Sequence, residues 1–273
     1  MGTKVILLGT GTPNPEPDRS GPSVVIMVDE EVYIVDFGPG IVRRAIEAGL
    51  TSAHLKRAYL THLHSDHTVG YPDLIFTPAV TDRNAPLEVY GPTGIEAMTN
   101  HILEAYKEDI RERTTGLEPA NQNSYIVRVH EIQSNFTGTI YSDDLVSVEA
   151  FPVDHGNLSC FGFKFKTPDK IIVVSGDTAP SDTLVEMARG CDILIHEVYS
   201  AKALQLRPTE WKRYHSSVHT SSYEVAEIAS KVRPKLLVLY HQLSWTSTDE
   251  ELVNEIRERY DGEVVSGNDL DVF

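Results

Sequence analysis

Apolar and polar positions follow two different patterns along the chain. Apolar runs of about four to eight residues, bounded by glycine, proline or acidic residues, are typical of strands, whereas apolar residues three or four positions apart mark one face of a helix. The first pattern predicts a hairpin at 23–38 that turns at Asp29–Glu31. It also predicts strands at 4–11, 55–62, 87–92, 125–132, 138–142, 145–153, 160–167, 170–178, 192–197, 235–241 and 269–273. The second predicts helices at 39–50, 94–113, 181–189, 220–232 and 248–260.

The order of these elements is similar in the two halves of the chain. In each half strands come first, and helices that return to further strands follow. Two sheets packed face to face, with helices on their outer surfaces, would bury the apolar side of every element. We therefore expect an α/β fold with two packed sheets. Because no linker rich in proline, glycine or serine separates the halves, we expect residues 1–273 to form a single domain.

Composition narrows the class of protein. Apolar residues make up 41 % of the chain, enough for a sizeable core, and no apolar run approaches the roughly 20 residues of a membrane span. The apolar run near the N-terminus is too short for a signal peptide, so we expect a cytoplasmic protein with no membrane partner. The two cysteines, Cys160 and Cys191, form no CxxC motif, and we expect both to be buried rather than paired in a disulfide.

The charge of the chain favours some partners over others. The net charge is −16, and no cluster of lysine and arginine is present. Proteins that bind nucleic acids usually present a basic surface to the phosphates. We therefore expect nucleic acid to be an unlikely partner, although a metal centre could attract a small anionic ester locally.

The segment THLHSDHTVG at 61–70 crowds metal-binding side chains together: His62, His64, Asp66 and His67. Histidine and aspartate are poor core residues unless each has a partner, whereas zinc accepts both as ligands. In extended backbone His62 and His64 point to the same side, and Asp66 and His67 would follow in the first turn of a helix. Four ligands from so short a segment suit two ions side by side better than one.

Further polar residues stand where apolar strands stop. His155 follows the strand at 145–153, Asp177 follows the apolar run KIIVVSG at 170–176, and His241 ends the strand at 235–241. Site residues are commonly found at such positions in layered folds. A carboxylate at Asp177 could bridge two cations.

These motifs resemble those of the metallo-β-lactamase-fold hydrolases. The resemblance rests on THLHSDH followed by VDH, SGDT and LYH, and it covers nearly the whole chain. It implies an αββα fold with two mixed sheets, and two divalent ions, expected to be zinc, with manganese or iron as alternatives. One ion would take His62, His64 and His155, the other Asp66, His67 and His241, with Asp177 bridging them. Asp36, in the segment VDFGPG, would support the ligands from behind.

Two further segments point to one branch of that family. ILIHEVY and VHTSS resemble the HEAT and HST elements of tRNase Z and its relatives. The resemblance implies that Glu197 orients His219, which gives a proton to the leaving oxygen. His215 lies in the same segment, but the HTS triplet favours His219. Asp66 would be a ligand that also orients the attacking hydroxide.

The chain also departs from tRNase Z. The arm with which the bacterial enzyme grips tRNA lies between the third histidine motif and the bridging aspartate, but here only 22 positions separate His155 from Asp177. Other segments resemble relatives assigned as arylsulfatases. We therefore expect a dinuclear zinc hydrolase of small esters, either phosphodiesters and phosphonates or aryl sulfates. The alternatives are a weak β-lactamase or lactonase, a tRNA 3′-processing endonuclease and a di-iron redox protein.

A few segments could determine substrate specificity or form an interface with a second copy of the chain. The segment 95–125 could overhang the site, and Arg19 or Tyr199 could touch the substrate. The helix at 95–112 could equally be a homodimer face or an ordinary core helix. We expect a small-molecule ester as substrate, and a homodimer is compatible with the sequence.

Overall fold

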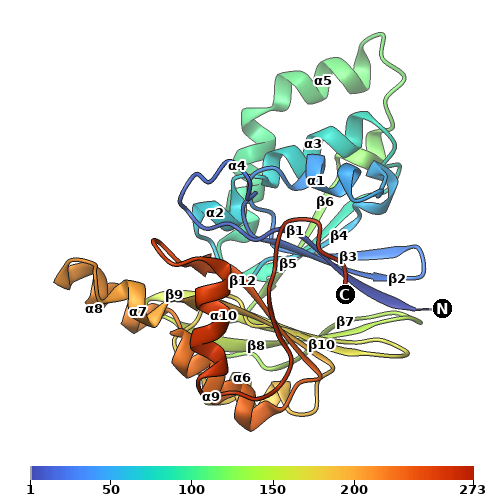
Figure 1. Ribbon diagram of the computed structural model, residues 1–273. Helices are drawn as coiled ribbons and strands as arrows, with labels where there is room; N and C mark the ends of the chain where they lie inside the picture. The colour runs from blue at the N-terminus through green and yellow to red at the C-terminus, as the bar shows by residue number, and fades with distance from the viewer. Residues whose placement is uncertain (1) are drawn as a thin grey trace.

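The computed structural model describes residues 2–273, which form two β-sheets packed face to face with helices on both outer surfaces (Figure 1). The N-terminal sheet is ordered β1 (Thr3–Gly9), β2 (Ser23–Val28), β3 (Glu31–Val35), β4 (Arg57–Tyr59), β5 (Leu87–Pro92) and β6 (Val127–Ile132). The C-terminal sheet is ordered β13 (Val264–Ser266), β12 (Leu236–Leu243), β11 (Ile193–Tyr199), β10 (Ile171–Val174), β9 (Leu158–Lys166), β8 (Ser147–His155) and β7 (Gly138–Ser142).

Both sheets are mixed, as the αββα prediction requires. Strands β1 to β3 pair antiparallel, and β3 to β6 pair parallel. In the second sheet β7 to β10 are antiparallel and β10 to β13 are parallel. The predicted fold class is therefore confirmed.

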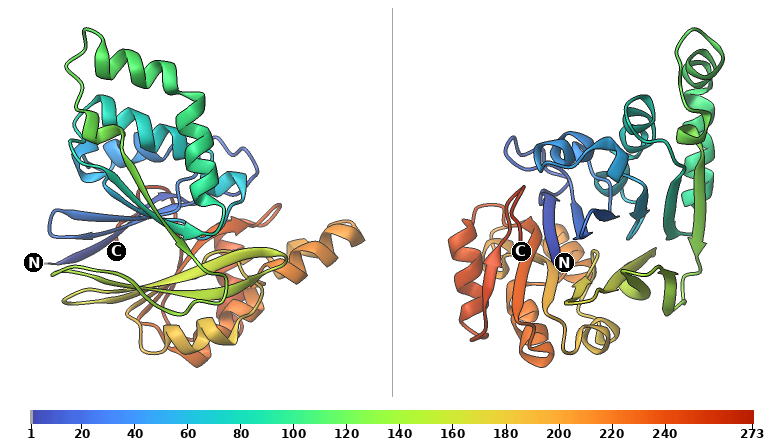
Figure 2. Two further views of the ribbon diagram at one scale, coloured as in Figure 1. Left: turned by 180° about the vertical axis from the view of Figure 1, so that it is seen from behind. Right: turned by 90° about the vertical axis from the view of Figure 1, so that its right-hand side faces the viewer.

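Helices cover the outer face of each sheet. Those that follow strands of the N-terminal sheet are α1 (Ile41–Glu47), η1 (Ser52–His54), α2 (Ser65–Thr68), α3 (Tyr71–Val80), α4 (Ile95–Ala105), α5 (Lys107–Thr115) and η2 (Gln122–Tyr125). Those that follow strands of the C-terminal sheet are α6 (Asp182–Ala188), α7 (Ala201–Leu204), α8 (Thr209–Val218), α9 (Ser222–Val232) and α10 (Asp249–Arg257). Figure 2 shows α8 projecting beyond the edge of this sheet.

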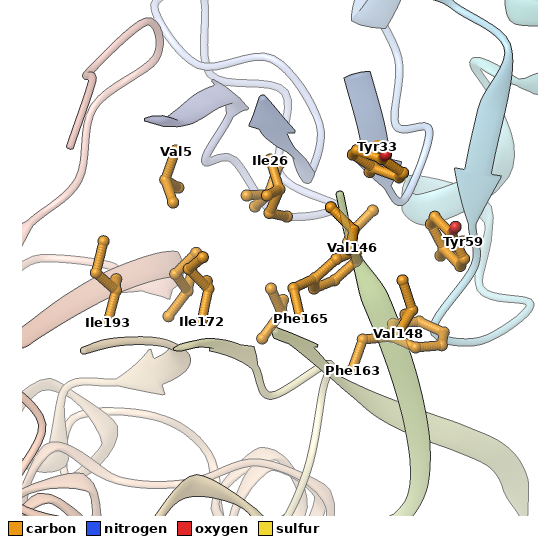
Figure 3. Packing of buried hydrophobic residues seen from close by; sticks show 14 of the residues in the cluster. Val5, Ile26, Tyr33, Tyr59, Val146, Val148, Phe163, Phe165, Ile172 and Ile193 are labelled. Atoms are coloured by element: carbon orange, nitrogen blue, oxygen red, sulfur yellow. The ribbon is translucent and has the colours of Figure 1, made fainter. Parts of the chain in front are cut away.

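The largest apolar cluster lies between the sheets. Val5, Ile26 and Tyr59 reach down from the N-terminal sheet toward Phe163 and Ile172 of the other sheet (Figure 3). Two further clusters lie between each sheet and its own helices. Burial of apolar area on three such layers is the main source of stability.

Both cysteines are buried and unpaired, as predicted. None of the helices within residues 2–273 combines the length and the apolar character needed to cross a bilayer.

Several elements differ from the sequence-based prediction. The helix expected at 94–113 is two helices that meet at Tyr106, whose ring packs on Phe76 with centroids 4.4 Å apart. Helices α3 and α8 and strand β13 were not predicted. The segment 269–273 is not a regular strand, but it lies along β1: Val272 bridges Ile6, and Val5 and Phe273 exchange backbone hydrogen bonds of 2.9 Å. Strand β13 has only three residues, and the prolines at 72 and 78 interrupt the helical pattern of α3, which explains why the pattern missed these two elements.

Candidate metal centre and active site

The histidine-rich segment begins just after β4. His62 and His64 lie in extended backbone, so they point to one side while Leu63 between them packs into the N-terminal apolar cluster. His64 is the residue that precedes α2, and Asp66 and His67 lie in the first turn of that helix. This is the local structure predicted for the segment. Asp66 and His67 are buried, and His64 is half-buried.

The other predicted residues reach the same place from the C-terminal sheet. His155 ends β8, and His241 lies near the end of β12. Asp177 follows β10 after a turn at Gly176, whose φ of 64° and close approach to the carbonyl of Phe161 favour glycine. The backbone at His241 is also left-handed, with a φ of 45°. Such a conformation is costly for a residue with a side chain and is concentrated at functional sites.

Seven side chains converge there in two groups. The ligand atoms of His62, His64 and His155 lie within 4.8 Å of one another, and so do those of Asp66, His67 and His241. We call these residues, together with Asp177, the seven-residue cluster. Asp177 lies between the groups: its Oδ2 is 3.9 Å from His62 Nε2, 3.6 Å from His67 Nε2 and 3.5 Å from His241 Nε2.

Fixed hydrogen bonds aim the imidazoles at the centre of the cluster. Asp36 Oδ2 accepts a hydrogen bond from His67 Nδ1 at 2.8 Å, which leaves His67 Nε2 facing Asp177. Thr61 N donates to Asp36 Oδ1 at 2.8 Å and holds the carboxylate in place. His155 Nδ1 donates to the carbonyl of Val218 at 2.8 Å. Partners of this kind orient metal-binding histidines in proteins.

The charge states of the cluster suit a cation with one exception: burial would lower the pKa of His67, but Asp177 and Asp36 outweigh it and raise that pKa well above its usual range. Burial, reinforced by His67, holds the pKa of His62 well below its usual range, and burial lowers that of His155. Burial alone would raise the pKa of Asp177, but His241 and His67 outweigh it and hold that pKa well below normal. Neutral imidazoles and a charged carboxylate are the forms that bind metals. His67 Nε2 and Asp177 Oδ1 are buried and have no hydrogen-bond partner among the described residues.

The predicted proton donor lies beside the cluster. Glu197, fully buried in β11, places its Oε1 3.4 Å from His219 Nδ1. The backbone N–H of Thr220 donates to the same Oε1 at 2.9 Å. Burial would lower the pKa of His219, but Glu197 outweighs it and the pKa is raised. His215 has no such carboxylate partner, and burial lowers its pKa to about 4.

A cavity of about 710 Å³ opens over these groups. Its floor includes His64, Asp66, Asp177, His219 and His241. It is also lined by residues of α8 and the segment before it, by Trp245, and by Pro13 and Asn14. The cavity has room for a phosphate ester and a neighbouring ring.

The predicted specificity elements lie elsewhere. Among the described residues that line the cavity, none belongs to the segment 95–125. The guanidinium of Arg19 is engaged within the protein and not with the cavity. It donates to Thr10 Oγ1 at 2.6 Å and pairs with Asp249 at 2.7 Å. Tyr199 is buried in a small apolar cluster. The wall is instead α8, and the segment PTEWKRYH contained a signal for it, since aromatic residues among charged ones often serve binding surfaces.

Comparisons with known proteins show the family to which the chain belongs. The family model for the Beta-lactamase superfamily domain matches residues 33–242. A protein of Mycobacterium bovis named ribonuclease Z is 31 % identical over 273 residues, which cover 98 % of this chain and 96 % of that protein. One from Mycobacterium marinum with the same name is 34 % identical over 242 residues, covering 87 % of this chain and 85 % of that protein.

Solved structures share the fold over its whole length. The metallo-β-lactamase-fold protein YhfI from Bacillus subtilis has a TM-score of 0.76 at 17 % identity and covers 100 % of both chains. The short form of human tRNase Z has a TM-score of 0.75 at 23 % identity, covering 99 % of this chain and 98 % of that one. Zinc-bound PqqB from Methylobacterium extorquens has a TM-score of 0.67 at 14 % identity, covering 99 % of each chain.

These relatives overturn one prediction. The expectation that nucleic acid is an unlikely partner, and a small ester the substrate, is wrong, because full-length relatives carry the name ribonuclease Z. Net charge is a sum over the whole surface, whereas binding depends on the local field, and bound divalent cations supply that field at a site. The missing arm is no objection either. The Mycobacterium bovis protein aligns over 96 % of its own length, which leaves no room for a long insertion.

Proposed function

Because the chain belongs to the β-lactamase superfamily and to its ribonuclease Z-like branch, we propose that it is a metal-dependent RNA endonuclease. Its substrate would be a folded RNA of the tRNA class, cut at a single phosphodiester bond. The observation that carries this proposal is the convergence of two ligand groups on Asp177 beneath an open cavity, with His219 and Glu197 at its edge. We infer that residues 1–273 act together as one catalytic domain, since both sheets contribute to the site.

We assign the seven-residue cluster as the ligands of two divalent ions. One would be held by His62, His64 and His155, the other by Asp66, His67 and His241, with Asp177 shared. Nitrogen and carboxylate donors favour zinc over magnesium or calcium, while manganese and iron remain alternatives that elemental analysis separates. Two bound cations would make a water molecule acidic enough to attack at neutral pH and would neutralise charge on the phosphate.

The protein's own groups complete the reaction. As water attacks, it releases one proton to the solvent, its oxygen bonds to phosphorus, and the bond to the leaving ribose oxygen breaks. His219, held protonated by Glu197, gives its proton to that oxygen, which leaves as a hydroxyl. Asp66 faces the same cavity and helps orient the water. Asp36 keeps His67 in the position that this arrangement needs.

A direct test is a cleavage assay with a precursor tRNA that carries a 3′ extension. The zinc-loaded protein should release the extension by one cut, and Asp177→Asn should not. A bis(p-nitrophenyl) phosphate assay run beside it checks that the centre is assembled. Turnover of this ester without any cleavage of RNA would refute the assignment to RNA while leaving the metal centre intact.

A further inference from the structure

The cavity has a wall of a different character from its floor. Trp211 and Tyr214 on α8, together with Trp245 after β12, line it, and we call these three residues the aromatic wall. Trp211 and Tyr214 are 45 % and 42 % exposed, so a large part of each ring is free to contact a ligand. Their ring centroids are 5.9 Å apart and the rings are nearly perpendicular. The wall thus presents flat apolar faces to the cavity.

An arginine completes the wall. The Arg207 guanidinium lies 6.0 Å from the ring centroid of Trp211 and 5.5 Å from that of Trp245. Its Nε is buried and has no hydrogen-bond partner among the described residues. Glu210 also lines the cavity on this side. A carboxylate that lines the same cavity as the arginine disfavours a second phosphate there and favours a neutral, flat group with hydrogen-bonding edges.

The wall is close to the proposed reaction centre. His215 stacks on Trp211 with centroids 5.7 Å apart and a 24° angle between the planes. The same His215 ring is 5.7 Å from His219, which is itself 5.8 Å from His241. A base stacked on Trp211 could therefore belong to the nucleotide next to a phosphate that is bound beside His219 and His241.

We propose that the aromatic wall and Arg207 form a nucleobase-stacking subsite for an unpaired nucleotide that flanks the scissile phosphate. This inference rests on the proposed RNA cleavage and adds a feature of the substrate to it. Stacking of a base on an aromatic side chain is tolerant of sequence, because every base has a π-face, and arginine strengthens it. It also supplies affinity that an acidic protein cannot obtain from a basic surface.

The wall can be probed without turnover, because the chain contains only two tryptophans, Trp211 and Trp245, and both line the cavity. Titration of the purified protein with adenosine 5′-monophosphate should quench tryptophan fluorescence saturably, and ribose 5-phosphate should not. Trp211→Ala should weaken binding of the nucleotide by about 5- to 100-fold, as read from Trp245, and Trp211→Phe should retain most of it. Circular dichroism checks that each variant is folded.

Other outcomes would overturn the subsite. Equal responses to the nucleotide and to ribose 5-phosphate would mean that only the phosphate binds. Tighter binding of phenyl phosphate than of the nucleotide would assign the wall to simple aryl groups. A change from dimer to monomer in Trp211→Ala, with nucleotide binding unaltered, would make the wall a protein interface.

A second assay separates the subsite from the proposed function. Precursor RNA with an abasic nucleotide next to the cut should be cleaved by the unmodified protein with a KM raised by about 5- to 100-fold, and Trp211→Ala should add nothing to that loss. Cleavage that ignores the missing base would refute the subsite alone. Saturable nucleotide quenching in a protein that cuts no RNA would refute the proposed function alone.

Discussion

The seven-residue cluster and the aromatic wall border the same cavity but are built in opposite ways. All but one of the cluster side chains are buried, and several are held by fixed hydrogen bonds, as Asp36 holds His67. Trp211 and Tyr214 in the wall are exposed. The cluster is thus preorganised for cations before anything binds, whereas the wall gains free energy only when a ligand covers it. Changes in the cluster should therefore affect the chemical step, and changes in the wall should affect affinity.

The largest expected effect comes from the residue that joins the two ligand groups. Asp177→Ala removes the carboxylate that faces His62, His67 and His241. RNA cleavage should fall by at least about 10³-fold, because both ions lose a ligand and the water they activate. Asp154→Ala is the matched control, since this aspartate lies beside His155 but is exposed, and its rate should be unchanged. Single-turnover cleavage measures both, and full activity in Asp177→Ala would contradict the shared-ligand assignment.

The next effect separates leaving groups. His219→Ala should reduce RNA cleavage by about 10²- to 10⁴-fold, because the ribose oxygen needs a proton as it leaves. Hydrolysis of bis(p-nitrophenyl) phosphate should lose much less, since nitrophenolate leaves without one. The ratio of kcat values for the two substrates is the measurement. Equal losses on both would remove His219 from the role of proton donor.

A smaller loss of metal affinity is expected from a change at Asp36, which holds the ligand His67 by a hydrogen bond. Asp36 has a φ of 60°, a conformation that asparagine tolerates, so Asp36→Asn keeps the backbone while it removes the charge. Metal affinity should weaken by about 10- to 100-fold, because His67 loses its orienting carboxylate. Asp29→Asn offers a control with a similar φ of 54° in the β2–β3 turn, at the other end of β3 from Asp36. Competition with a zinc-binding dye would compare the two, and matching affinities would mean that Asp36 does not support the site.

The pH dependence tests the pairing of Glu197 with His219. A proton donor works below its own pKa, so cleavage should decline as pH rises through the pKa of His219. Glu197 raises that pKa, and Glu197→Gln should therefore move the declining limb to lower pH. A pH profile of kcat in both proteins measures the shift. An unmoved limb, or one displaced to higher pH, would break the assignment.

The smallest effect is expected in the wall. Trp211→Ala should change the free energy of unfolding by no more than about 0.5 kcal/mol, because the ring is 45 % exposed. Phe163→Ala, in the apolar layer between the sheets, should cost about 3–5 kcal/mol. Urea denaturation measures the free energy of unfolding of both variants. A large loss in Trp211→Ala would mean that the wall is structural and would weaken the case for a base-stacking subsite.

The same contrast explains what the sequence could predict. The cluster was predictable because its residues stand at the ends of apolar strands, and parallel strands such as β10, β11 and β12 bring those ends to one edge of a sheet. The wall was not, although Trp211, Tyr214 and Val218 stand three and four positions apart, because such spacing does not tell a stripe that covers a core from one that lines a cavity. Arg19 likewise showed no sign in sequence of its partner Asp249, 230 positions away. Net charge misled the prediction about nucleic acid because it averages over the surface that the site does not use.

Metal content per chain tests the central claim most directly. After reconstitution with zinc and extensive dialysis, elemental analysis should find two zinc ions per chain in the unmodified protein. In His155→Ala, which loses one ligand of the first group only, it should find about one. A content of one or less in the unmodified protein, or an unchanged content of two in a variant that lacks both His62 and His67, would contradict the dinuclear centre on which the whole account depends.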